Sequence, residues 1–167
     1  MPNRSIREGL VVGLIAYAAV AAFYAAFDVL AARGPLYTVN LLGKVVFRGL
    51  RDPAILQFPL ALDATVIFGY NAFHLVVSLA IGLVVTSLVV RAARQFEDAP
   101  VILLVIVAGF VVTVFAVGFL TAGIRPLLPW WSILIANVLA TFAGGVYLVW
   151  RYPVWQSASG GHRHAVS

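Results

Sequence analysis

Residues 66–85 read VIFGYNAFHLVVSLAIGLVV, a stretch apolar enough to lie in lipid. At a rise of about 1.5 Å per residue, a helix of this length crosses the ~30 Å hydrocarbon core of a bilayer. Further runs of this kind lie before and after it, which gives four expected spans at roughly residues 9–32, 64–90, 100–124 and 129–150. The sequence therefore predicts an all-α transmembrane bundle of four helices in up-down order.

Composition agrees with this class of protein. Of the 167 residues, 63% are hydrophobic and 10% are charged, whereas charged residues make up about 25% of soluble domains. We expect one membrane domain over residues 1–156 and a disordered polar tail over residues 157–167. The chain has no cysteine, which excludes disulfides, thiolate metal sites and cysteine nucleophiles.

The net charge of +5 comes from basic residues at the ends of the expected spans. This placement is typical of anchoring to lipid head groups and does not indicate nucleic-acid binding. With four spans both termini lie on one side of the membrane. Six arginines lie on that side, and five basic residues lie on the other. This small excess favours cytoplasmic termini.

The connection between the first two spans contains a second kind of helix. Residues 38–50, TVNLLGKVVFRGL, carry apolar and polar side chains on different sides. The apolar side is expected to hold Leu41, Leu42, Val45 and Val46, and the polar side Asn40, Lys44, Arg48 and Arg51. We therefore expect an interfacial amphipathic helix with Thr38 as its N-cap, or alternatively a docking element for a partner subunit.

Small residues recur at a spacing of four in two spans, which allows the backbones of helices to approach closely in lipid. The first span has Gly9 and Gly13, followed by Ala18, Ala22 and Ala26; the fourth span has Ala136, Ala140 and Gly144. The third span carries no titratable side chain and is expected to be a packing helix. Aromatic anchors at the two membrane interfaces are expected at Trp130, Trp131, Trp150 and Trp155.

Placing a polar side chain inside a bilayer costs free energy, so its presence there indicates a structural or functional role. His74 lies roughly 15 Å into the second span, on one helix face with Asn71 and Ser78, and Asn137 of the fourth span lies at a compatible depth. The charges nearest that side are Asp28, Asp63, Arg33 and Arg125, which could form pairs.

Three interpretations of His74 compete. It could hydrogen-bond Asn137 or Ser78 and fix helix packing. It could ligate a porphyrin-type cofactor, a bacteriochlorophyll or a haem, although a bis-histidine haem lacks a second imidazole at this depth. It could also handle protons or a substrate in a small transporter, together with Asp28 or Asp63.

No catalytic motif is present in the sequence: HExxH, GxSxG and paired midplane aspartates are all lacking. The first expectation is therefore a non-catalytic accessory or scaffold subunit, without a cofactor, that packs against membrane lipids and larger integral membrane partners.

Three segments carry a resemblance: FDVLAARGPLYTVNLLGKVVF (27–47), GYNAFHLVVSLAIGLVV (69–85) and LPWWSILIANVLATFAGGVYLVWRYP (128–153). In these segments the chain resembles small four-span bacterial membrane proteins of uncharacterised function. The resemblance rests on Asp28, Pro35, Thr38, Leu42, Gly43, His74, Trp131, Asn137, Gly145 and Arg151. It implies a shared membrane fold that includes His74 and Asn137, and it implies no particular chemistry.

Overall fold

Helices make up most of the computed structural model, which describes residues 2–152. The elements are α1 (Pro2–Leu30), α2 (Tyr37–Arg48), α3 (Ala64–Arg94), η1 (Phe96–Asp98), α4 (Ala99–Leu120), η2 (Ala122–Ile124) and α5 (Trp130–Arg151). Trp155 and the tail over residues 157–167 lie outside the described residues, so the predictions made for them stay predictions.

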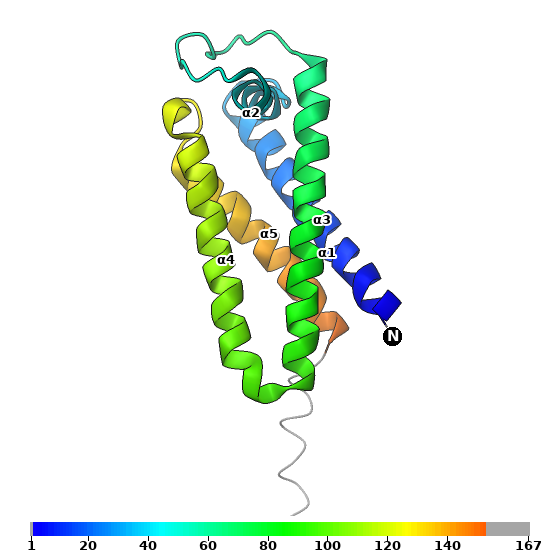
Figure 1. The fold of residues 1–167 in the computed structure, drawn as a ribbon. Coiled ribbons are helices and arrows are strands. Elements are labelled where there is room, and N and C mark those ends of the chain that lie inside the picture. Colours follow the sequence, from blue (N-terminus) through cyan, green and yellow to red (C-terminus); the bar gives the residue numbers. More distant parts are fainter. Residues whose placement is uncertain (1, 153–167) are drawn as a thin grey trace, which may run out of the picture.

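Four of these helices, α1, α3, α4 and α5, are long and apolar enough to cross a membrane, which confirms the four-span fold. Their bounds differ from the expected spans at the ends. α1 begins at Pro2, before the apolar run, and α4 ends at Leu120, where the chain turns through η2. Consecutive spans run in opposite directions, and the first residues of α1 lie at the same end as the last residues of α5 (Figure 1).

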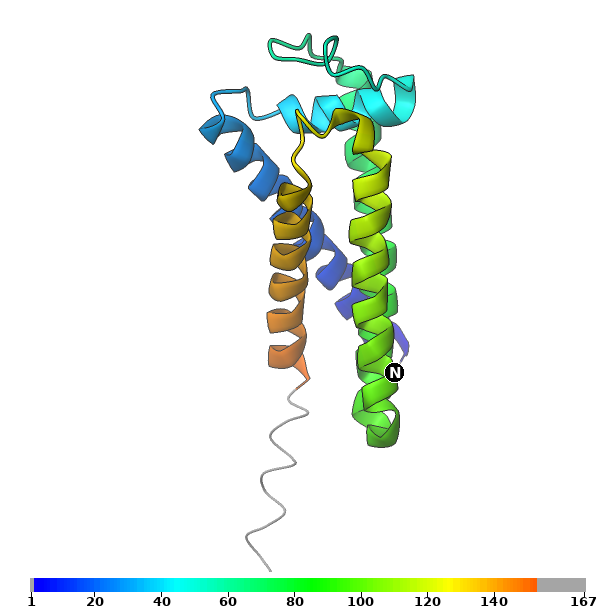
Figure 2. The same ribbon diagram turned by 90° about the vertical axis from the view of Figure 1, so that its left-hand side faces the viewer.

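α2 lies across the opposite end of the bundle, roughly at right angles to the spans, as the two views of the ribbon show (Figure 2). It buries Leu41, Leu42 and Val45 of the expected apolar side, whereas Val46 is only partly buried. It ends at Gly49, whose φ of 65° is a conformation that glycine adopts without strain. Asn40 differs from the prediction, because it is fully buried on the side that faces the loop before α3.

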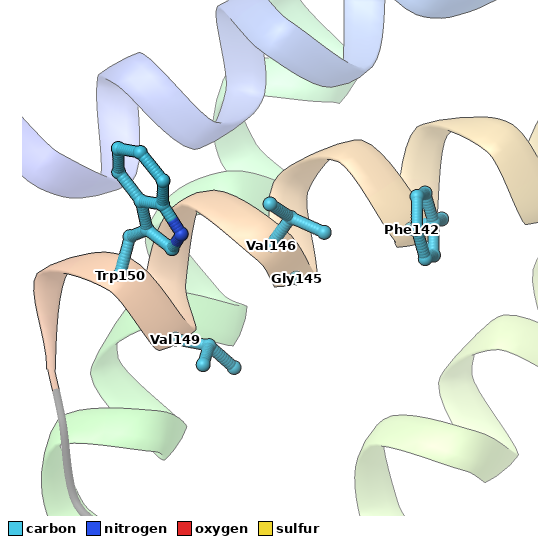
Figure 3. Close-up of a pocket in the computed structure, with 5 residues that line it drawn as sticks. All are labelled: Phe142, Gly145, Val146, Val149 and Trp150. Atoms are coloured by element: carbon cyan, nitrogen blue, oxygen red, sulfur yellow. The ribbon is translucent and has the colours of Figure 1, made fainter.

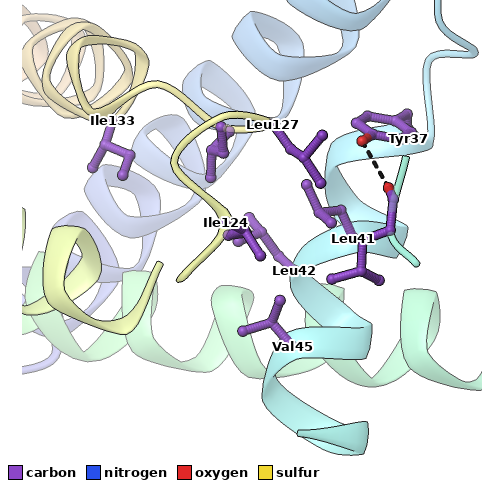
Figure 4. Packing of buried hydrophobic residues seen from close by; sticks show 9 residues of the cluster. Tyr37, Leu41, Leu42, Val45, Ile124, Leu127 and Ile133 are labelled. Carbon is purple, nitrogen blue, oxygen red and sulfur yellow. Dashed lines mark hydrogen bonds between the residues drawn. The ribbon is translucent and has the colours of Figure 1, made fainter. Parts of the chain in front are cut away.

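A cluster of buried apolar side chains joins α2 to the connection between α4 and α5 (Figure 4). Its members are Tyr37, Leu41, Leu42, Val45, Leu56, Ile124, Leu127, Leu128 and Ile133. Water is close to this end of a membrane protein, so burying these side chains is favourable here in a way that it is not in the middle of a lipid bilayer. The cluster therefore fixes α2 on the ends of the spans.

Glycines bring α1 and α3 into backbone contact. A Cβ atom built on Gly13 would lie 2.6 Å from the Cα of Leu79, and one on Gly82 would lie 2.7 Å from the Cα of Gly13. Gly144 of α5 packs in the same way against the side chain of Val12 of α1. Gly9 and Gly13 of α1, and Ala136 and Gly144 of α5, are thus buried inside this chain, and Ala140 is partly buried.

α4 is the least packed of the four spans. Only 6% of its most apolar window is buried, against 28% for α5. Ile102 is its one buried residue. α4 contacts both α3 and α5 but buries little of its own surface, so its expected role as a packing helix stays a prediction.

Candidate functional site

The polar residues at mid-membrane depth gather where α1 passes α3. The hydroxyl of Tyr17 donates to Oδ1 of Asn71 at 2.9 Å, and the amide of Asn71 donates to the carbonyl of Ile67, one turn earlier, at 2.9 Å. The rings of Tyr17 and His74 are 5.2 Å apart between centroids, and those of Tyr70 and His74 are 6.1 Å apart. We call Tyr17, Tyr70, Asn71 and His74 the aromatic cluster.

His74 and Asn137 do not form the hydrogen bond that their depths allow. The amide of Asn137 donates instead to the carbonyl of Ile133 in its own helix, at 2.8 Å. Ser78, one turn below His74, is buried at the crossing of α1 and α3. Within residues 2–152 no hydrogen bond joins the imidazole of His74 to another protein group. The imidazole is only partly buried.

Asp28 has a role that the sequence does not suggest. Its side chain is fully buried and accepts from the main-chain N–H of Thr38 at 2.7 Å and from the Thr38 hydroxyl at 2.6 Å. Thr38 is therefore not the N-cap, because α2 begins one residue before it. A carboxylate from α1 takes the place of a capping side chain and satisfies a free N–H in the first turn of α2.

The expected charge pairs are rearranged. Nη1 of Arg33 donates to the carbonyl of Leu127 at 3.1 Å, and its guanidinium lies 4.8 Å from the centre of the Tyr37 ring. Burial raises the pKa of the Tyr37 phenol, and the charge of Arg33 opposes this rise. Arg33 therefore ties the end of α1 to α2 and to the loop before α5, and forms no salt bridge with Asp28.

Asp63 caps α3 through hydrogen bonds from the main-chain N–H groups of Thr65 and Val66. Its other oxygen lies 3.1 Å from Nη2 of Arg48, at the end of α2. The hydrogen bond from Arg48, together with these N–H groups, lowers the pKa of the Asp63 carboxyl below its ordinary value. The other expected partner, Arg125, is exposed.

A second buried acid, Glu8, was not singled out from the sequence. It lies at the opposite end of the bundle, where Nε of Arg151 donates to it at 2.8 Å and the hydroxyl of Tyr147 donates to its second oxygen. Glu8 is 1% exposed. These bonds join the first turns of α1 to the last turns of α5. The sequence does contain a signal for this role, because Glu8 lies just before an apolar run. An acid in that position needs a partner when the helix packs.

The surface of the spans is apolar. Trp130 and Trp131 are exposed at the start of α5 and Trp150 at its end, and the Trp131 ring meets the edge of Phe27 at 5.7 Å. A shallow hollow of about 440 Å³ lies along α5 (Figure 3). It is lined by Phe142, Gly145, Val146, Val149 and Trp150. Apart from the indole N–H of Trp150 its lining side chains are apolar, so it offers mainly apolar contact.

Residues 2–152 contain no group of three or more His, Asp or Glu side chains placed to hold a metal ion. Comparisons with protein-family models, with curated proteins and with solved structures found no match.

Proposed function

We propose that this chain is a non-catalytic integral membrane subunit that packs against larger integral membrane partners. The observation that carries the proposal is the alanine stripe of α1, which consists of Ala18, Ala22 and Ala26. These residues remain exposed after the chain has folded, whereas Gly9 and Gly13 on the same helix are buried against α3. Small residues repeated every four positions suit the close approach of another helix, and contact with lipid does not require them.

The charged side chains support the same proposal. The Asp28 carboxylate accepts a hydrogen bond from Thr38. The Asp63 carboxylate accepts one from the first turn of α3 and forms a salt bridge with Arg48. Both acids therefore stabilise the ends of helices, which argues against their serving with His74 in transport. The pKa of the Asp63 carboxyl is lowered, so this group is ionised at neutral pH and is not suited to taking up a proton there.

We further propose that the chain lies in a bacterial inner membrane with cytoplasmic termini, which places α2 on the outer side. The chain has no cysteine of its own. Gln57, before α3, and Gln95, between α3 and α4, are both exposed and lie at opposite ends of the bundle. In spheroplasts, a membrane-impermeant maleimide is expected to label Gln57→Cys, and to label Gln95→Cys only after the membrane is broken. The reverse pattern would invert the orientation.

The partner proposal is tested by purification from the native membrane in a mild detergent, followed by quantitative mass spectrometry. Ala22→Leu adds bulk to the alanine stripe and is expected to lose most of the co-purifying subunits. Ala108→Leu is the matched control, because it adds the same bulk to an exposed alanine on the loosely packed α4.

Both variants should keep the circular dichroism and melting temperature of the wild type, because neither alanine is packed inside the chain. Wild-type protein that purifies without other chains, or equal recovery of partners with Ala22→Leu, would contradict the proposal.

A further inference from the structure

Two side chains of the aromatic cluster have polar groups that the folded chain leaves without a partner. The hydrogen bonds of the cluster join Tyr17 to Asn71 and Asn71 to Ile67. Within residues 2–152, the hydroxyl of Tyr70 and the imidazole of His74 hydrogen-bond no protein group. Both lie in α3, roughly 9 and 15 Å below its first residue. At this depth there is no bulk water to supply the missing bonds.

The surroundings of these two groups are uncharged. Asp28, further along the same side of α1, is already bound to Thr38, and Arg33 to Leu127. A charged ligand such as a phosphate or an amine would therefore be left unpaired in a low-dielectric site, at a large cost. The ligand that fits is neutral and carries hydrogen-bonding oxygen atoms.

The cluster offers aromatic surface against which a flat ligand can pack. The Tyr17 and Tyr70 rings flank His74, tilted by 52° and 32° to the imidazole. A Tyr hydroxyl and a neutral imidazole can each donate and accept a hydrogen bond. Tyr70 and His74 therefore suit a ligand whose ring carries two oxygen atoms. In the oxidised ligand these oxygens accept hydrogen bonds, and in the reduced ligand they both donate and accept them. We propose that Tyr70 and His74 bind the head group of a lipid-soluble quinone.

A ligand of this kind would enter from the lipid. Tyr17, Tyr70 and His74 are only partly buried, so part of each side chain is accessible from outside the chain. α4 packs loosely, and no atom outside its own backbone lies within 4 Å of a Cβ built on Gly109 or Gly118. The prenyl tail of a quinone can therefore lie along α4 while its ring reaches α3.

The test is calorimetric titration of purified protein in phosphatidylcholine nanodiscs with a benzoquinone that carries one prenyl unit. The wild type is expected to bind one equivalent saturably. Tyr70→Phe removes one hydroxyl and His74→Phe removes the ring nitrogens while keeping an aromatic ring. Each is expected to weaken binding about three- to tenfold, the effect of one uncharged hydrogen bond. Tyr152→Phe, beyond the end of α5, is the matched control and should bind like the wild type.

Circular dichroism and melting temperature establish that each variant is folded. The absence of saturable binding by the wild type would overturn the inference, as would equal affinities of Tyr70→Phe and Tyr152→Phe. A haem or chlorin absorption band in the purified protein that disappears in His74→Phe would also overturn it, because His74 would then be a metal ligand. The inference stands apart from the proposed function: Ala22→Leu tests partners without touching this site.

Discussion

The crossing of α1 and α3 gives the sharpest prediction. In Gly82→Ala the new Cβ would lie 2.7 Å from the Cα of Gly13, and closer still to the Gly13 nitrogen and the Gly9 carbonyl oxygen. Carbon atoms in contact lie about 3.5–4.0 Å apart, so the two helices must separate by roughly 1 Å. All the atoms in the way are main chain, and no change of rotamer can relieve the contact. We expect a loss of about 2–3 kcal/mol in the free energy of unfolding, at the upper end of the range for overpacking.

The assay is equilibrium unfolding in mixed micelles, followed by tryptophan fluorescence, because Trp131 meets Phe27 of α1 and reports its docking. Gly109→Ala is the matched control. Its Cβ has open space, so better helix propensity should leave stability unchanged or raise it by up to about 1 kcal/mol. A Gly82→Ala variant as stable as the wild type, or two variants that lose stability equally, would refute the reasoning.

Three other predictions concern the buried and capping acids. Arg151→Met removes the arginine that donates to the buried Glu8, leaving only Arg7 near it, and should lower the midpoint in the same unfolding assay; an unchanged midpoint would contradict this. Thr38→Val removes one hydrogen bond to the buried Asp28 and should speed amide exchange in α2 more than in α5, measured by mass spectrometry; uniform exchange would contradict it. Asp63 has a lowered pKa, so its stabilising effect is present above its ordinary pKa of about 4 and is lost as the pH falls through its folded value. The melting temperature should therefore fall less between pH 6 and about pH 3 in Asp63→Asn than in the wild type, and parallel curves would argue against the cap.

The helices could be predicted from the sequence because each follows from local composition. Apolar runs of about 20 residues mark the spans, and the alternation of apolar and polar residues over 38–50 marks α2. Arg91, in the last turn of α3, pairs with Asp98, as their closeness in the sequence suggests. The ends of the helices are harder to predict from the sequence, because α1 extends over the polar residues before its apolar run.

The pairing of polar groups could not be predicted, because it depends on how the helices cross. Glu8 and Tyr147 meet across 139 positions of sequence. Asn137 lies at the depth of His74 but turns to a carbonyl of its own helix, a local bond that competes with every interhelical partner. Asp28 faces α2 rather than Arg33, since only the fold reveals that a free N–H lies beside it.

The central claim, that the alanine stripe of α1 meets another membrane subunit, is tested most directly by photo-crosslinking in intact membranes. A photoreactive phenylalanine replaces Ala22 in one variant and Ala108, on α4, in the other. The account predicts one discrete protein adduct from position 22 and lipid adducts alone from position 108. Lipid adducts alone from both positions, with both proteins folded, would contradict it.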